Sequence, residues 1–86
     1  MKNPHESDFE LKVRPTSKLT LDWLRLQSTE YLTESLVETG LGEQLEWNQN
    51  GVVLEGNHRI HVLKERGVDV HEIARQVWNR KFGGNP

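Results

Sequence analysis

The clearest pattern in the chain is a helical repeat of apolar residues near its C-terminal end. Positions separated by three or four residues carry Val70, Ile73, Ala74, Val77, Trp78 and Phe82. This spacing is typical of the inner face of an amphipathic helix. Asp69 and Glu72 supply a D-x-x-E capping box where the repeat begins. The pattern therefore predicts a helix over residues 70–82.

An alternating pattern on both sides of a turn predicts a β-hairpin over residues 44–55. Leu45 and Trp47 alternate with charged or polar neighbours, and Val52-Val53-Leu54 is a short apolar run. The dipeptide Asn50-Gly51 between them is the strongest short-range signal for a tight hairpin turn. Residues 9–13 also alternate between apolar and charged, which predicts a half-buried strand that Pro15 ends.

Capping and stop signals predict two further helices. Ser28 is a suitable N-cap for a helix over residues 29–39, which Gly40 ends. Another helix is expected over residues 59–66, closed by Gly67. Within residues 16–27 the apolar positions begin to alternate and then break the alternation. We interpret this stretch as an irregular connection that covers the core.

Length and composition limit these elements to one domain. The chain has 86 residues, 34% of them hydrophobic, and a mean hydropathy of −0.75. So few apolar side chains build only one core. We expect a single α+β domain over residues 1–86, with a mixed or antiparallel sheet and a loose N-terminal segment at residues 1–8. A homodimer would bury more surface and is kept as a hypothesis.

Cysteine content and charge restrict the functional classes. The chain has no cysteine, which excludes disulfides, thiolate chemistry and cysteine-based zinc sites. No apolar run approaches the roughly 18 residues that span a bilayer, so we expect a soluble cytoplasmic protein. Residues 1–55 hold five Lys and Arg against ten Asp and Glu, whereas residues 56–86 hold six against three. Positive charge is therefore concentrated in the C-terminal third.

The candidate chemistry lies in the stretch E-G-N-H-R at residues 55–59, where the hairpin meets the next helix. A helix begins with unpaired N–H groups and with partial positive charge from its aligned peptide dipoles. Gly56 lacks a Cβ, so a phosphate could approach the N–H groups from Asn57 to Ile60. His58 and Arg59 would add side-chain donors, and Arg59 could bind bidentately.

A structural interpretation of the same residues stays open. Asn57 could cap the helix, His58 could bond locally, and Arg59 could pair with Glu55.

A helix dipole contributes about 0.3–1 kcal/mol and a charged hydrogen bond about 1.5–3 kcal/mol, so a single phosphate would be held weakly. A nucleotide, which offers several phosphates, a sugar and a base, is therefore favoured over free phosphate.

The segment VVLEGNHRIHVLKERGVDV, with the TGL before the hairpin, resembles the ParB/sulfiredoxin superfamily over roughly residues 30–70. In that superfamily the corresponding loop binds nucleotide phosphates, those of ATP, ADP or CTP. The resemblance implies that Gly56, His58 and Arg59 belong to the phosphate loop. It also implies that Glu55 replaces the family's usual aspartate. If a metal takes part, we expect Mg²⁺ carried by the nucleotide.

Three departures from the family pattern alter this expectation. Asn57 stands where sulfiredoxins carry their catalytic cysteine, which excludes sulfinic-acid reduction. His61-Val62 replaces the two small residues that usually follow. The 86 residues leave no room for the helix-turn-helix DNA-binding domain of the segregation proteins. The resemblance thus implies a minimal, single-domain phosphate-binding module.

We therefore expect a nucleotide- or phosphate-binding module whose binding residues are Gly56, Asn57, His58, Arg59 and Ile60. Whether it is an enzyme is left open. If the ligand is turned over, we expect phosphoryl transfer or nucleotide hydrolysis with Mg²⁺. His58 and Arg59 would then stabilise developing charge, and Glu55 would organise metal or water. No metal site is assigned to the protein's own side chains.

Two alternatives come from other functional classes. The first is a DNA-associated or nuclease-like accessory protein, in which Arg75 and Arg80 of the basic C-terminal third contact DNA. The second is a non-catalytic regulatory protein that binds another protein, which predicts that Trp78 and Phe82 form an exposed patch.

Overall fold

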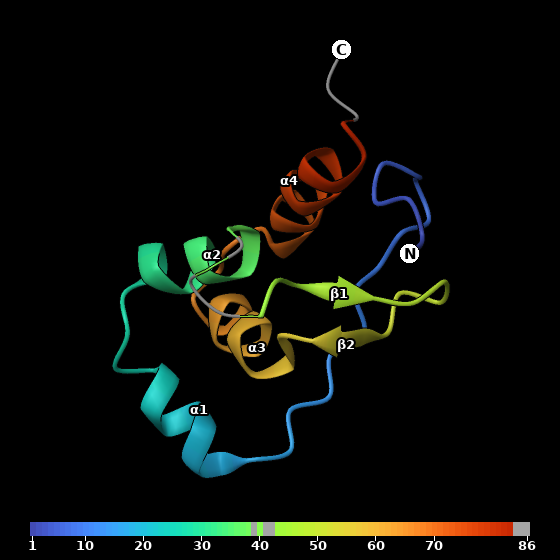
Figure 1. The fold of residues 1–86 in the computed structure, drawn as a ribbon. Helices are drawn as coiled ribbons and strands as arrows, with labels where there is room; N and C mark the ends of the chain where they lie inside the picture. The colour runs from blue at the N-terminus through green and yellow to red at the C-terminus, as the bar shows by residue number, and fades with distance from the viewer. Residues whose placement is uncertain (39, 41–42, 84–86) are drawn as a thin grey trace.

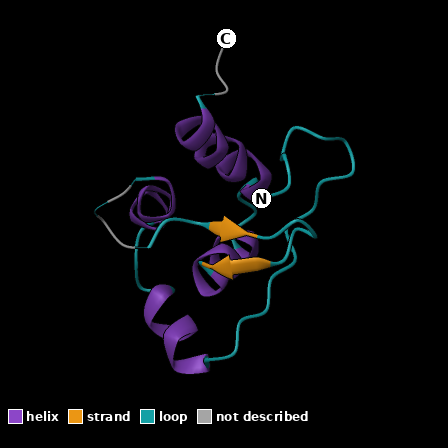
Figure 2. Ribbon diagram, turned by 45° about the vertical axis from the view of Figure 1, so that its right-hand side comes forward, coloured by secondary structure: helices purple, strands orange, loops and turns teal. Residues whose placement is uncertain are grey.

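The computed structural model describes residues 1–38, 40 and 43–83, and these have an α+β architecture. The elements follow in the order α1 (Lys18–Leu24), α2 (Thr29–Val37), β1 (Glu46–Trp47), β2 (Val53–Glu55), α3 (Asn57–Glu65) and α4 (Val70–Phe82). Helices α1, α2 and α4 each pack against α3. The hairpin lies beside α3 in Figure 1 and in front of it in Figure 2. Helix α3 is therefore the central element of the fold.

The hairpin predicted over residues 44–55 is confirmed as a two-stranded antiparallel sheet. Glu46 pairs with Glu55 and Trp47 pairs with Val53, so the register shifts and Leu54 has no partner in the ladder. A bulge of this kind re-aims a side chain near the end of a strand. Leu54 is accordingly 60% exposed although it belongs to an apolar run.

The strand predicted over residues 9–13 is reduced to a single parallel bridge between Lys12 and Val52. The N–H of Lys12 donates to the carbonyl of Gly51 (2.8 Å), and the N–H of Val53 donates to the carbonyl of Lys12 (2.9 Å). Because β2 is only three residues long, it offers the N-terminal segment too short an edge for a full third strand.

The irregular connection predicted over residues 16–27 is wrong, because α1 forms within it. The Ser17 side chain accepts a hydrogen bond from the N–H of Thr20 and caps the helix. Leu24 is buried on the inner side of α1, whereas Leu19 and Trp23 are exposed on the other. The sequence pattern failed here because both sides of α1 carry apolar residues, which hides the helical period.

The other helices lie close to their predicted ranges. Helix α4 has the predicted bounds, and the Asp69 side chain accepts hydrogen bonds from the N–H groups of His71 and Glu72. Helix α3 begins two residues before the predicted start at residue 59. Helix α2 ends at Val37, and residue 39 of its predicted range lies outside the described residues. No helix in the described part of the chain is long and apolar enough to span a membrane.

The core lies between α3, the hairpin and the facing sides of α2 and α4. Its fully buried side chains include Trp47, Leu32, Leu36, Leu45, Ile60, Leu63, Val62 and Val77. The indole N–H of Trp47 donates to the carbonyl of Lys2 (2.8 Å), and the ring of Phe9 meets that of Trp47 edge-on with centroids 5.6 Å apart. Trp47 therefore connects residues 1–8, which we predicted to be loose, to the hairpin.

Gly56 marks the closest packing at the start of α3. Its φ is +102°, and a Cβ at this position would lie 2.8 Å from Cδ2 of Leu36 and 3.4 Å from Cδ1 of Leu45. Leu36 is fully buried, so it has no space to withdraw. Only glycine both adopts this backbone conformation and leaves room for α2.

We predict that Gly56→Ala lowers the free energy of unfolding by about 2–4 kcal/mol, because backbone strain and overpacking add. Gly67→Ala is the matched control, since Gly67 also has a positive φ (+79°) but has no atom within 4 Å of an added Cβ. The control should lose only about 1–2 kcal/mol of backbone strain. Urea unfolding of both variants measures the difference, and equal losses would show that packing against Leu36 is not the constraint.

Candidate functional site

A groove of about 620 Å³ opens where α3 begins. Its walls come from the end of β2, the first residues of α3, α1, α2 and the extended segment that leads into α1. Four of the residues expected to bind a ligand line it, namely Gly56, Asn57, His58 and Arg59, and so does the proposed metal-organising residue Glu55. The structure therefore brings most of the predicted site residues together at one hollow.

The start of α3 has no side-chain cap. Ser17, Ser28 and Asp69 cap the other three helices, whereas the N-cap of α3 is Gly56, which has no side chain to offer. The N–H of Ile60 donates to the carbonyl of Gly56 (2.9 Å). The N–H groups of residues 57–59 precede this first helical bond, and no described residue accepts a bond from them.

Ile60 does not contribute to the groove, although we expected it to. Its N–H is used in the first turn of α3, and its side chain is fully buried in the core. The amides that could meet an anion are thus those of residues 57–59, one fewer than the sequence suggested.

Asn57 and His58 fasten the extended segment 14–17 to the start of α3. Oδ1 of Asn57 accepts from the N–H of Arg14 (2.8 Å), and its Nδ2 donates to the carbonyl of Val53 (2.9 Å). Nε2 of His58 accepts from the N–H groups of Thr16 (3.2 Å) and Ser17 (3.0 Å). An accepting Nε2 belongs to a neutral ring that carries its hydrogen on Nδ1. His58 therefore has one remaining donor, Nδ1–H, for any ligand.

Arg59 spans from α3 to α2 and to the chain that precedes β1. Its Nη1 donates to the carbonyl (3.0 Å) and the hydroxyl (3.1 Å) of Ser35, and its Nη2 donates to the carbonyl of Glu43 (2.6 Å). Burial lowers the pKa of Arg59, and the charge of Glu55 partly offsets this effect. The ion pair with Glu55 that we considered does not form between these described residues. Arg59 keeps its charge, which adds positive potential to the groove.

Arg14 is the cation at the groove that the sequence did not reveal. It lines the groove and is exposed, and its side chain makes no hydrogen bond or ion pair with any residue that the structure describes. Only the bond between its backbone N–H and Asn57, 43 residues away, brings it there. No local pattern marks such a residue, because its position results from tertiary contacts.

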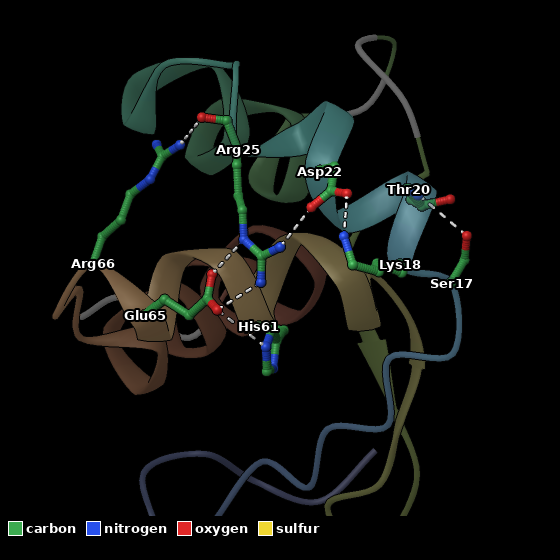
Figure 3. Close-up of polar contacts among 8 residues, drawn as sticks. All are labelled: Ser17, Lys18, Thr20, Asp22, Arg25, His61, Glu65 and Arg66. Carbon is green, nitrogen blue, oxygen red and sulfur yellow. Dashed lines mark hydrogen bonds and ion pairs between the residues drawn. The ribbon is translucent and has the colours of Figure 1, made fainter.

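The opposite wall of the groove depends on a charged cluster that holds α1 to α3 (Figure 3). The Arg25 guanidinium donates to both carboxylate oxygens of Glu65 (3.0 and 2.7 Å) and to Asp22 (2.9 Å). The hydrogen bond from Arg25 lowers the pKa of Glu65. Arg66 adds bonds to the carbonyls of Arg25 (3.1 Å) and Gln27 (2.9 Å). These contacts fix the position of α1 and of the side chains it presents.

No group of three metal-ligating side chains exists in the described part of the chain. The two histidines of α3 have different partners and do not form a shared ligand pair. His58 bonds to the segment before α1, whereas Nε2 of His61 lies 3.5 Å from Glu65 in the charged cluster. The acidic residues near the groove are Glu55, which is partly exposed, and Glu43, which is exposed.

Comparison with known proteins identifies no relative of this chain. The sequence matches no protein-family model, and neither the curated proteins nor the solved structures yield a match. The resemblance to the ParB/sulfiredoxin superfamily therefore stays a prediction.

We predict that Arg59→Ala lowers the free energy of unfolding by about 2–4 kcal/mol, because it removes the one charged donor that the buried Ser35 carbonyl has among the described residues. Lys64→Ala, on the exposed side of the same helix, should change stability by no more than about 0.5 kcal/mol. Urea unfolding distinguishes the two. If both variants unfold at the wild-type midpoint, the bonds of Arg59 to α2 do not contribute to the stability of the fold.

Proposed function

We propose that the groove binds a nucleotide or another phosphorylated ligand, with a phosphate at the first turn of α3. The observation that carries the proposal is that a helix start without a capping side chain opens on a hollow lined by an arginine that pairs with no described residue. The amides of residues 57–59 face no acceptor among the described residues, and Arg14 lines the same groove. Positive helix dipole, backbone donors and a guanidinium together favour an anion.

The size of the groove and the strength of its contacts favour a ligand larger than one phosphate. A hollow of about 620 Å³ falls within the roughly 300–1,000 Å³ of small-molecule sites. The helix dipole supplies about 0.3–1 kcal/mol and one charged hydrogen bond about 1.5–3 kcal/mol, which gives weak binding for inorganic phosphate. A nucleotide, which has several phosphates together with a sugar and a base, would fill more of the groove.

A magnesium ion fits this arrangement as a companion of the phosphates. Mg²⁺ is commonly held by one or two carboxylates together with substrate phosphates, and both Glu55 and Glu43 line the groove. Bound there, the ion would neutralise phosphate charge. Glu55 would hold it or orient a water, and His58 Nδ1–H would donate to the phosphate. The Arg59 guanidinium, which Ser35 and Glu43 hold in place, would add positive charge. Phosphoryl transfer or nucleotide hydrolysis is the reaction that this set of groups would support.

A minimal ParB/sulfiredoxin-like module acting in the cytoplasm is the finer form of this proposal. Its support is the sequence LEGNHR, together with the place of that sequence at a strand-to-helix junction beside the groove. The DNA-binding alternative is less favoured, because Arg75 pairs with Asp69 and Glu72 and Arg80 pairs with Glu38. These ion pairs neutralise the basic surface on which that alternative depends.

A protein-binding role, including a homodimer, is the second candidate. Phe82 is 56% exposed, and its ring centroid lies 4.3 Å from that of the partly buried Trp78. Both residues lie in the last turns of α4. Phe82 is exposed, as that alternative predicted, whereas Trp78 packs partly buried against the core. Sedimentation of the protein at several concentrations tests self-association.

We predict that ATP, ADP, CTP or GTP, with or without Mg²⁺, shifts the NMR amide signals of residues 57–59, and that Arg14→Ala weakens this binding about tenfold or more. Arg14 is the suitable residue to replace because its exposed side chain supports no contact in the described fold, unlike that of Arg59. Lys64→Ala removes the same charge at the other end of α3 and should bind like wild type. Shifts elsewhere, or equal loss in both variants, would contradict the proposal.

A further inference from the structure

Two aromatic side chains are left outside the core and line the same groove. Trp23 of α1 is 56% exposed and Tyr31 of α2 is 43% exposed. The other described aromatic residues are buried or packed in pairs, as Phe9 is with Trp47. Neither Trp23 nor Tyr31 has an aromatic partner or a side-chain hydrogen bond among the described residues. Their rings are thus available to a ligand.

The position of Trp23 is fixed although its ring is exposed. Helix α1 is capped by Ser17 and connected to α3 through the ion pair of Arg25 with Glu65 (Figure 3). Arg25 is two residues away from Trp23 in the sequence. The next residue, Leu24, is buried in the core. An indole on such a helix loses little conformational freedom when a flat ring stacks on it.

The remaining lining of the groove complements a ring joined to a phosphate. The exposed Leu54, displaced by the bulge of β2, adds an apolar surface. Tyr31 and Arg59 both line the groove, so aromatic and cationic side chains share its lining. Glu43 and Glu55 add acceptors that amino or hydroxyl groups of a ligand could use.

We propose that Trp23 is the ring-binding residue of this groove, and that the ligand is a phosphate joined to a flat aromatic ring, a nucleotide, rather than an inorganic or sugar phosphate. This inference rests on the proposed function, because it assumes that the phosphate lies at the first turn of α3. The reason is chemical: inorganic phosphate has nothing to cover the exposed indole and a sugar ring has no π face, whereas a base stacks flat on the indole and gains stacking energy.

The test compares ligands with and without a ring on matched variants. Binding of ATP, CTP and inorganic tripolyphosphate is measured by calorimetry on wild type, Trp23→Ala, Trp23→Phe and Leu19→Ala. Leu19 lies on the same helix, is 83% exposed and does not line the groove, so its variant controls for loss of exposed apolar surface on α1. Thermal unfolding of each variant checks that the fold is kept.

Trp23→Ala should weaken at least one of the two nucleotides about tenfold or more and leave tripolyphosphate binding unchanged. Trp23→Phe should restore most of the affinity, and Leu19→Ala should behave like wild type. The inference is overturned if Trp23→Ala binds both nucleotides like wild type, or if tripolyphosphate binds as tightly as they do, while weaker binding by Arg14→Ala still supports the phosphate site. If none of the three ligands binds wild type, the proposed function fails and the inference fails with it.

Discussion

The close approach of Gly56 to Leu36 is the constraint on which the rest of this structure depends. The chain leaves β2 and enters α3 at a left-handed residue that touches a fully buried leucine of α2. Because this position has space for hydrogen alone, the helix starts without a capping side chain. The same contact brings α3 near enough to α2 for the Arg59 guanidinium to reach Ser35. Packing, and not a sequence motif alone, explains why the helix start is open.

The polar residues that follow Gly56 have structural roles, and the sequence did not reveal the partners to which they bond. Asn57 and His58 accept hydrogen bonds from the segment before α1, and Arg59 donates to α2 and to the chain before β1. Each of the three side chains therefore positions one wall of the groove. What remains for an anion is the backbone of the first turn, the Nδ1–H of His58 and the exposed Arg14. A phosphate site built in this way would depend on side chains mainly for its shape and on amides for its contacts.

Local patterns predicted the elements whose signals are local. The Asn50-Gly51 turn predicted the hairpin, and the helical repeat with its Asp69 cap predicted α4. Helix α1 was missed because Leu19 and Trp23 place apolar side chains on its exposed side, where the helical pattern expects polar ones. The groove was foreseen at Gly56–Arg59. Arg14, Trp23 and Tyr31 could not be foreseen, because they reach it from elements whose arrangement is set by long-range contacts.

Helix α1 matters both for the fold and for the proposed site, because it packs on α3 and carries Trp23. Seven residues are too few to form a stable helix alone in water, so α1 depends on its contacts with α3. Most of these are polar and exposed: the charged cluster around Arg25, and the bonds of His58 to the segment before α1. Exposed ion pairs contribute little each, so it is their number, together with the buried Leu24, that holds the wall carrying Trp23. A ligand that touches both Trp23 and the start of α3 would add contacts across the junction between α1 and α3. Because that stabilisation exists only when the ligand is bound, binding energy and the local order of α1 are linked.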